Sequence, residues 1–232
     1  MTTYASTIGT GLERAYRHWR ERGALLQLPR AEEMITPMII AISRDYGAGG
    51  SEIALALADR LDWPLYDHEL LEKIAGDTGV QEQLLENLDE KRPNWLAECL
   101  EGFSNERHIS GVGFAIRMKK ILLALYCHGN CILLGHAAAQ VLPADHSLFV
   151  RLIAPLQYRI DRIAEKLNIP EHDAKTRVAE IDDGRKEFVR SYFHMDSTDP
   201  STYDLVINTA KFGEAACVDI IVAALERRRE IS

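Results

Sequence analysis

Residues 38–54 read MIIAISRDYGAGGSEIA, and this stretch decides how the rest of the chain is organised. It begins as a short apolar run typical of a buried strand, turns at three glycines, and continues with apolar residues at helical spacing. The glycines are Gly47, Gly49 and Gly50, and the helical positions are Ile53, Leu57 and Leu61. Glycines let backbone N–H groups converge without obstruction by Cβ atoms, and a helix N-terminus carries a partial positive charge. The stretch therefore predicts a strand, a glycine loop and a helix that together bind phosphate.

The glycine loop matches the phosphate-binding motif G-x-x-x-x-G-K-[ST] only in part. With Gly49 on the second glycine of the motif, Arg44 replaces the first glycine and Gly50 replaces the lysine. Ser51 keeps the Ser/Thr position, so we predict that it contacts Mg²⁺ held by a bound nucleotide. We predict that Arg44 supplies the charge of the missing lysine. The alternative is a glycine-rich turn between strand and helix that binds nothing.

The composition indicates a soluble globular protein. A chain of 232 residues with 47% hydrophobic residues can bury a sizeable core. The formal net charge of −8 disfavours nucleic-acid binding, which needs a basic surface to displace counterions. The four cysteines are irregularly spaced, and no apolar run resembles a membrane span or a secretory signal. We therefore expect a cytoplasmic protein with reduced thiols that contacts neither membranes nor nucleic acid.

The chain divides into an expected helical extension at residues 1–36 and a main domain at residues 37–232. An apolar stripe at helical spacing marks the extension as an amphipathic helix, with Leu12, Tyr16 and Trp19. We expect this helix to pack against the main domain or a partner subunit, which includes a homodimer. Membrane-surface binding is the weaker alternative, because glutamates dilute the positive charge of the helix.

Strands and helices alternate along the main domain. Beyond the first strand, strands are expected at residues 64–67, 131–134, 147–153 and 203–209. Helices are expected at residues 49–61, 68–75, 114–126, from 156 onward, 171–192 and 214–229. This alternation predicts an α/β fold of three layers, in which helices cover both faces of a parallel sheet. Ligands then bind at the carboxyl ends of the strands.

Two polar side chains follow the ends of predicted strands. Asp67 ends the second strand, and His136 follows the third. We predict that both bind substrate, since the carboxyl ends of parallel strands share one edge of the sheet. Alternatively, Asp67 only caps the following helix, and His136 only caps a helix or fills the core.

Several arginines suit the recognition of phosphate. Arg159 and Arg162 lie three residues apart on one helical face, and each offers a planar fork of donors. Arg185 and Arg190 belong to a long charged helix that either closes as a lid over a nucleotide or forms a salt-bridged surface. The polar segment at residues 81–117 holds further candidates for binding an anionic substrate, namely Arg92, Arg107, His108 and Arg117. Alternatively, these residues form a solvated helical face.

Together these motifs resemble the cytidylate kinase-like branch of the P-loop nucleoside monophosphate kinases. Five segments match in the order of the family: 42–50, 64–67, 154–160, 182–185 and 203–209. They extend over about residues 37–230. The resemblance implies a P-loop core of parallel strands, a helical insertion that binds a nucleoside monophosphate, and a lid that carries arginines.

The resemblance also implies a reaction, namely transfer of phosphoryl from ATP with Mg²⁺ to a nucleoside monophosphate such as CMP or dCMP, or to a similar small acceptor. It places the ATP phosphates over the loop formed by Gly47, Ala48, Gly49, Gly50 and Ser51. It places the acceptor near Asp67. The catalytic residues it implies around the transferred group are Arg159, Arg185 and Arg190.

Two positions depart from the family pattern. Cytidylate kinases carry Gly-Arg-Asp after the third strand, where this chain has Gly135-His136-Ala137. The residue after the double glycine is often basic in the kinase-like branch, and here it is Ser51. Glycine at the lysine position, as in Gly50, is common within that branch. Both changes remove positive charge from the predicted phosphate site. Two alternatives therefore stay open: a nucleotide-binding regulatory protein that has the fold without the chemistry, and a phosphoryl transferase with a non-nucleotide acceptor.

Overall fold

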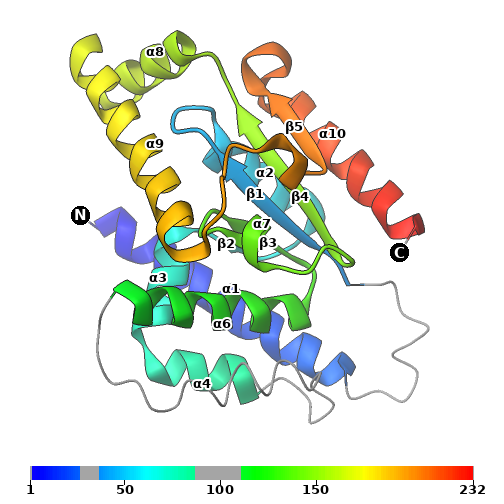
Figure 1. Ribbon diagram of the computed structural model, residues 1–232. Helices are drawn as coiled ribbons and strands as arrows, with labels where there is room; N and C mark the ends of the chain where they lie inside the picture. The colour runs from blue at the N-terminus through cyan, green and yellow to red at the C-terminus, as the bar shows by residue number, and fades with distance from the viewer. Residues whose placement is uncertain (1, 27–36, 87–110, 232) are drawn as a thin grey trace.

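A five-stranded parallel sheet forms the centre of the molecule (Figure 1). The computed structural model describes residues 2–26, 37–86 and 111–231. The strands are β1 (Ile39–Arg44), β2 (Leu65–Tyr66), β3 (Cys131–Leu134), β4 (Ser147–Ile153) and β5 (Leu205–Asn208). Their order across the sheet is β2-β3-β1-β4-β5. The predicted α/β fold with a parallel sheet is thus confirmed.

Strand β1 lies in the middle of the sheet because its side chains are apolar on both faces. Ile39 pairs with Cys131 of β3 on one side and with Ser147 of β4 on the other. Successive side chains point to opposite faces. Ile39 and Ala41 therefore enter one hydrophobic core, and Ile40 enters the other.

One face of the sheet is covered by α2 (Gly50–Leu61) and α10 (Thr209–Ile231). The apolar residues predicted for the helix after the glycine loop point into this core, since Ile53 and Leu57 are fully buried there. Helix α10 begins earlier than the sequence suggests. Its first residues are separated from the rest by Gly213, whose backbone is not helical.

The opposite face is covered by α1 (Thr2–Leu26), α3 (His68–Gly76), α4 (Thr78–Glu86), α6 (Gly111–His128) and α7 (Ala138–Val141). The expected N-terminal helix is present as α1, and Trp19 from its apolar stripe is fully buried in this core. Arg92, Arg107 and His108 lie outside the described residues. Within the described ranges, no helix has both the length and the apolar character that crossing a bilayer requires.

Helices α8 (Leu156–Leu167) and α9 (Glu171–Phe193) form a hairpin beside the carboxyl ends of the strands (Figure 1). Ile160 and Ile163 of α8 pack against Ala174 and Val178 of α9 in a small separate core. Tyr46 of the glycine loop packs against the same core. The hairpin therefore places the middle of α9 directly beside the loop.

Two histidines are buried beneath the sheet, His18 in α1 and His128 in α6. Burial lowers the pKa of His18 to about 3 and the pKa of His128 to about 4. The charge of Arg22 contributes to both of these shifts, and that of His128 contributes more to the shift of His18. Both imidazoles are therefore neutral in the folded protein at neutral pH.

The buried histidines predict that acid destabilises the protein. Their pKa values in the folded state lie below the ordinary value of 6.5, so the unfolded chain binds more protons below that pH. We expect the free energy of unfolding to fall between pH 7 and pH 5 by roughly 1–2 kcal/mol per histidine. Urea denaturation at several pH values measures this dependence. His18→Gln should weaken it, and an equally steep dependence in that variant would contradict the assignment.

Candidate active site

The glycine loop connects β1 to α2 at the carboxyl edge of the sheet. Gly47 and Gly49 have φ angles of +85° and +79°, in the left-handed region that favours glycine. Gly49 also occupies the N-cap position of α2, so the loop directs backbone N–H groups at the start of that helix. A Cβ atom on Gly47 would lie 2.8 Å from the backbone oxygen of Arg159, so helix α8 closes off one side of the loop.

Replacing Gly47 by alanine is expected to destabilise the fold by about 2 kcal/mol or more, since both the φ angle and the backbone of α8 oppose a side chain. The matched control is Gly184→Ala in α9, where an added Cβ meets nothing within 4 Å. That change should stabilise the protein by about 0.5–1 kcal/mol, because alanine favours the helix. Chemical denaturation of both variants measures the difference, and a shift of the same sign in both would contradict the account.

A small cavity of about 110 Å³ lies over the glycine loop. Of the residues predicted to bind phosphate, Arg44, Gly47, Gly49, Gly50 and Ser51 line it. Ala48 does not, because it is buried beneath the loop. On the far side the cavity is lined by Arg162 and Lys166 of α8. Both of these cations contact Glu52.

Arg44 fills the space that a side chain at position 50 would need. A Cβ atom on Gly50 would lie 2.7 Å from Cγ of Arg44, and a Cβ atom on Gly135 would lie 2.3 Å from its Nη1. The two glycines therefore form a passage through which the Arg44 side chain runs. Arg44 and a lysine at position 50 cannot both occupy this arrangement.

The charge of Asp67 acts on the Arg44 guanidinium from a distance, without a direct contact. Within the described part of the chain, no hydrogen bond or ion pair joins it to another residue. Burial and the neighbouring charge of Arg185 lower its pKa and the charge of Asp67 raises it, with a net pKa of about 9. Arg44 is still protonated at neutral pH, so a partly buried positive charge faces the cavity.

A second, larger cavity of about 530 Å³ lies between the carboxyl ends of β1 and β3 and helix α9. It meets the small cavity at four residues that line both: Arg44, Asp45, Tyr46 and Arg185. The two cavities thus share one boundary, and two of the four residues on it are arginines.

Arg185 of α9 reaches this boundary over the glycine loop. Its Nη1 donates a hydrogen bond of 3.2 Å to the backbone oxygen of Arg44. Its guanidinium carbon lies 5.6 Å from the centre of the Tyr46 ring. Burial lowers the pKa of Arg185, although the carboxylates of Asp182 and Asp45 oppose the shift.

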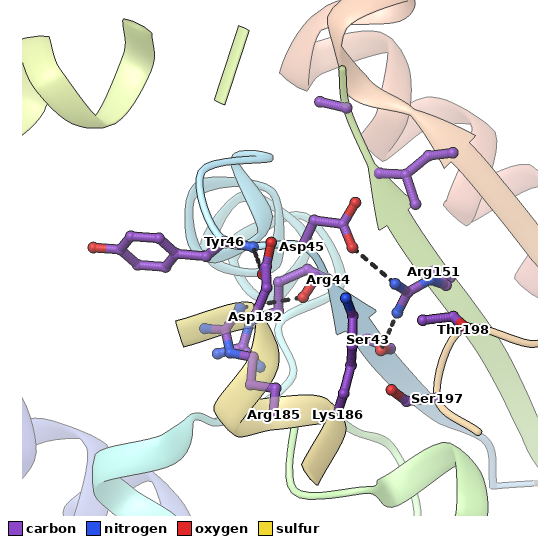
Figure 2. A network of polar contacts seen from close by, with 12 residues as sticks. Ser43, Arg44, Asp45, Tyr46, Arg151, Asp182, Arg185, Lys186, Ser197 and Thr198 are labelled. Atoms are coloured by element: carbon purple, nitrogen blue, oxygen red, sulfur yellow. Dashed lines mark hydrogen bonds and ion pairs between the residues drawn. The ribbon is translucent and has the colours of Figure 1, made fainter. Parts of the chain in front are cut away.

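Arg151 of β4 holds the end of β1 (Figure 2). It donates to Oγ of Ser43 at 3.0 Å and to Oδ1 of Asp45 at 2.8 Å. Burial raises the pKa of Asp45, and the charge of Arg151 opposes that rise. This ion pair fixes the first residue after β1 at the boundary between the cavities.

Arg159 and Asp182 join the α8–α9 hairpin to the glycine loop. Nη1 of Arg159 donates to Oδ2 of Asp182 and, at 3.1 Å, to the backbone oxygen of Tyr46. Oδ1 of Asp182 accepts from the backbone N–H of Tyr46 at 2.8 Å, as Figure 2 shows. Arg159 is buried and lines neither cavity.

His68 and His136 form a pair on the wall of the larger cavity. Nδ1 of His68 lies 2.7 Å from Nε2 of His136. The two rings are stacked, with their centroids 4.7 Å apart. The ring centroids of Phe114 and Phe188 lie 6.5 Å and 6.4 Å from that of His136. Burial lowers the pKa of His136 to about 4, and the charges of His68 and Arg44 add to this effect.

Other predicted residues lie apart from the boundary. Oδ1 of Asp67 accepts from the backbone N–H of Leu70 at 2.9 Å and caps α3, and Asp67 lines neither cavity. Arg190 is exposed on α9 and pairs with Glu187. Arg117 in α6 also lines neither cavity.

Sequence reasoning missed Arg151 and the aromatic wall of the larger cavity. An arginine inside an otherwise apolar strand is the signal that could have identified Arg151, since a buried charge requires a partner. For Phe188 the sequence offers no comparable signal, because a phenylalanine in a helix is usually part of a core.

Ser51 is the residue that fits a Mg²⁺ ion in this site. Its side chain is exposed and lines the small cavity. The described residues include no group of three acidic, histidine or cysteine side chains that could hold a metal. Mg²⁺ commonly takes few protein ligands together with phosphate oxygens, and the site suits that mode of binding.

Comparison with known proteins agrees with this geometry. Residues 39–211 match the model of the Cytidylate kinase-like family. A cytidylate kinase of Methanocella arvoryzae is 26% identical over 196 residues, which cover 83% of this chain and 99% of that protein. A cytidylate kinase of Haloarcula marismortui is 30% identical over 193 residues, which cover 82% of this chain and 90% of that protein.

A solved structure shares the fold. An uncharacterized protein from Eubacterium ventriosum superposes with a TM-score of 0.64 at 23% identity, covering 82% of this chain and 99% of that one. The family match covers β1 to β5, the glycine loop and the α8–α9 hairpin, and the resemblance seen in the sequence is confirmed. The chain therefore belongs to the cytidylate kinase-like family.

Proposed function

We propose that this protein is a nucleotide kinase that transfers the γ-phosphoryl group of ATP, with Mg²⁺, to CMP, dCMP or a similar nucleoside monophosphate. The observation that carries the proposal is the shared boundary of two cavities, one over the glycine loop and one lined by aromatic rings. A kinase must bring a donor and an acceptor into line at one point. Membership of the cytidylate kinase-like family supports the same reaction.

The donor side is the small cavity. ATP phosphates lie along the backbone N–H groups from Gly47 to Ser51, where the start of α2 favours negative charge. Ser51 would hold Mg²⁺ together with the phosphates, and the ion would supply positive charge that neutralises the transferred group. Arg44 takes the role of the lysine in the usual motif, since its side chain occupies the space over Gly50.

The boundary supplies charge for the transition state. Arg44 and Arg185 both have lowered pKa values, and the charge of Arg185 disfavours that of Arg44. A phosphoryl group between them relieves this repulsion. Negative charge is spread over the oxygens of the transferred group, and fixed cations stabilise it without reorganising.

The acceptor side is the larger cavity. Its wall offers the rings of Phe114 and Phe188 and the paired imidazoles of His68 and His136. Flat rings stack on a nucleobase, and imidazole nitrogens offer both a donor and an acceptor to its edge. In this proposal Asp67 acts by capping α3, and Arg159 acts by holding Tyr46 and Asp182.

A regulatory nucleotide-binding protein is the second candidate. It is favoured by the missing lysine at Gly50 and by the engagement of Arg159 with protein groups. Such a protein binds ATP in the small cavity without transferring phosphoryl.

Turnover measurements distinguish the two candidates. Purified protein is incubated with ATP, Mg²⁺ and one acceptor from a panel of CMP, dCMP, UMP, AMP and GMP, and the nucleoside diphosphate is measured directly. We expect turnover of about 1 per second or faster with a cytidine acceptor, the low end of the kinase range. ATP binding without turnover for any acceptor would favour the regulatory protein.

A further inference from the structure

Helix α1 lies outside the region that matches the family, yet it belongs to the core. The family match begins at residue 39, and α1 ends at Leu26. Ala15 and Trp19 of this helix are fully buried. The helix packs against α3, α4 and α6 on the face of the sheet opposite α2 and α10 (Figure 1).

A chain of hydrogen bonds runs from α1 to strand β2. Nε1 of Trp19 donates to the Tyr66 hydroxyl at 2.7 Å, and Nε2 of His18 lies 2.8 Å from the backbone oxygen of Gly129. A carbonyl only accepts, so Nε2 of the neutral His18 carries the proton. Nδ1 of His18 then accepts from the Tyr66 hydroxyl at 3.2 Å. The buried polar groups of these three side chains are mutually satisfied.

The same helix caps α6. Nε of Arg22 donates to the backbone oxygen of His128 at 2.7 Å, next to the Gly129 oxygen that His18 contacts. The last carbonyl groups of a helix have no partner within it, and a cation is favourable there. Arg22 and His18 therefore fix the carboxyl end of α6.

Both elements held by α1 lead to the larger cavity. Tyr66 is followed by Asp67, which caps α3, and α3 carries His68 and Glu72 on the cavity wall. Helix α6 carries Phe114 on the same wall. We propose that α1 positions the acceptor side of the active site through His18, Trp19 and Arg22. The assignment of the larger cavity to the acceptor rests on the proposed function.

The proposal predicts an effect on one substrate only. Tyr66→Phe removes the hydroxyl that joins Trp19 to His18 and leaves the ring in place. We expect the KM of the acceptor to rise roughly fivefold, at the low end of measured couplings between sites, while the KM of ATP stays unchanged. Trp19→Phe removes the other end of the same bond and should have the same effect, so the test does not depend on the folding of one variant. The control is Arg17→Ala, on the exposed side of α1.

Amide hydrogen exchange provides a readout that does not need turnover. In Tyr66→Phe and Trp19→Phe, we expect faster exchange in α3 and in the first turns of α6, and unchanged exchange in α2 and α10. Unchanged exchange in α3 and α6 would overturn the proposal, as would equal rises in both KM values. If the wild type phosphorylates no acceptor, the proposed function fails, and the exchange data alone decide whether α1 positions this wall.

Discussion

Replacing Arg185 by alanine is expected to lower kcat by about 10³-fold, as for other arginines that stabilise the transition state of phosphoryl transfer. Arg185 lines both cavities at their boundary, where the transferred group passes in the proposed reaction. The affinity for ATP should change little, because the interaction is made mainly in the transition state. Steady-state kinetics together with ATP titration measure the two effects separately.

The control for Arg185→Ala is Lys175→Ala, an exposed cation on the same helix. It should leave kcat unchanged. A loss of ATP binding equal to the loss of kcat in Arg185→Ala would show instead that Arg185 binds the donor in its ground state.

Replacing Arg44 by glutamine is expected to lower kcat by about 10²–10³-fold, the usual cost of removing one fixed donor from a transition-state site. The substitution also removes a partly buried charge that no hydrogen bond or ion pair joins to another described residue, so the folded protein should be no less stable. Loss of activity at unchanged or higher stability separates a functional arginine from a structural one.

A rescue experiment tests whether Arg44 stands in for the lysine of the motif. In the double variant Arg44→Ala/Gly50→Lys, the space left by the arginine accepts a lysine at the motif position. We expect this variant to be more active than Arg44→Ala alone. Gly50→Lys in the wild-type background should be impaired, because Cβ would lie 2.7 Å from Cγ of Arg44. A double variant no more active than Arg44→Ala alone would contradict this role.

The sheet could be predicted closely from the sequence, since buried parallel strands are short apolar runs. Strand β4 has the predicted bounds, Ser147–Ile153. Strand β5 is shorter than predicted and begins at Leu205. The residues before it are engaged elsewhere, because the carboxylate of Asp204 accepts from the backbone N–H of Phe149 at 2.7 Å. Such a contact between distant residues has no local signal in the sequence.

Only the part of the candidate site formed by residues adjacent in the sequence could be predicted. The loop residues from Gly47 to Ser51 form a continuous motif, and all of them except the buried Ala48 line the small cavity. The engagement of Arg159 depends on Asp182, which the α8–α9 hairpin brings to it. The passage around Arg44 depends on Gly135, which follows β3 and is distant in sequence from Arg44 at the end of β1.

The most direct test of the central claim is the binding of a bisubstrate analogue, adenosine and cytidine joined through their 5′ positions by five phosphates. If the two cavities form one active site, calorimetry should show one analogue per chain, bound at least about 10²-fold more tightly than ATP. An analogue that binds no more tightly than ATP would contradict the claim that phosphoryl passes between these cavities at Arg44 and Arg185.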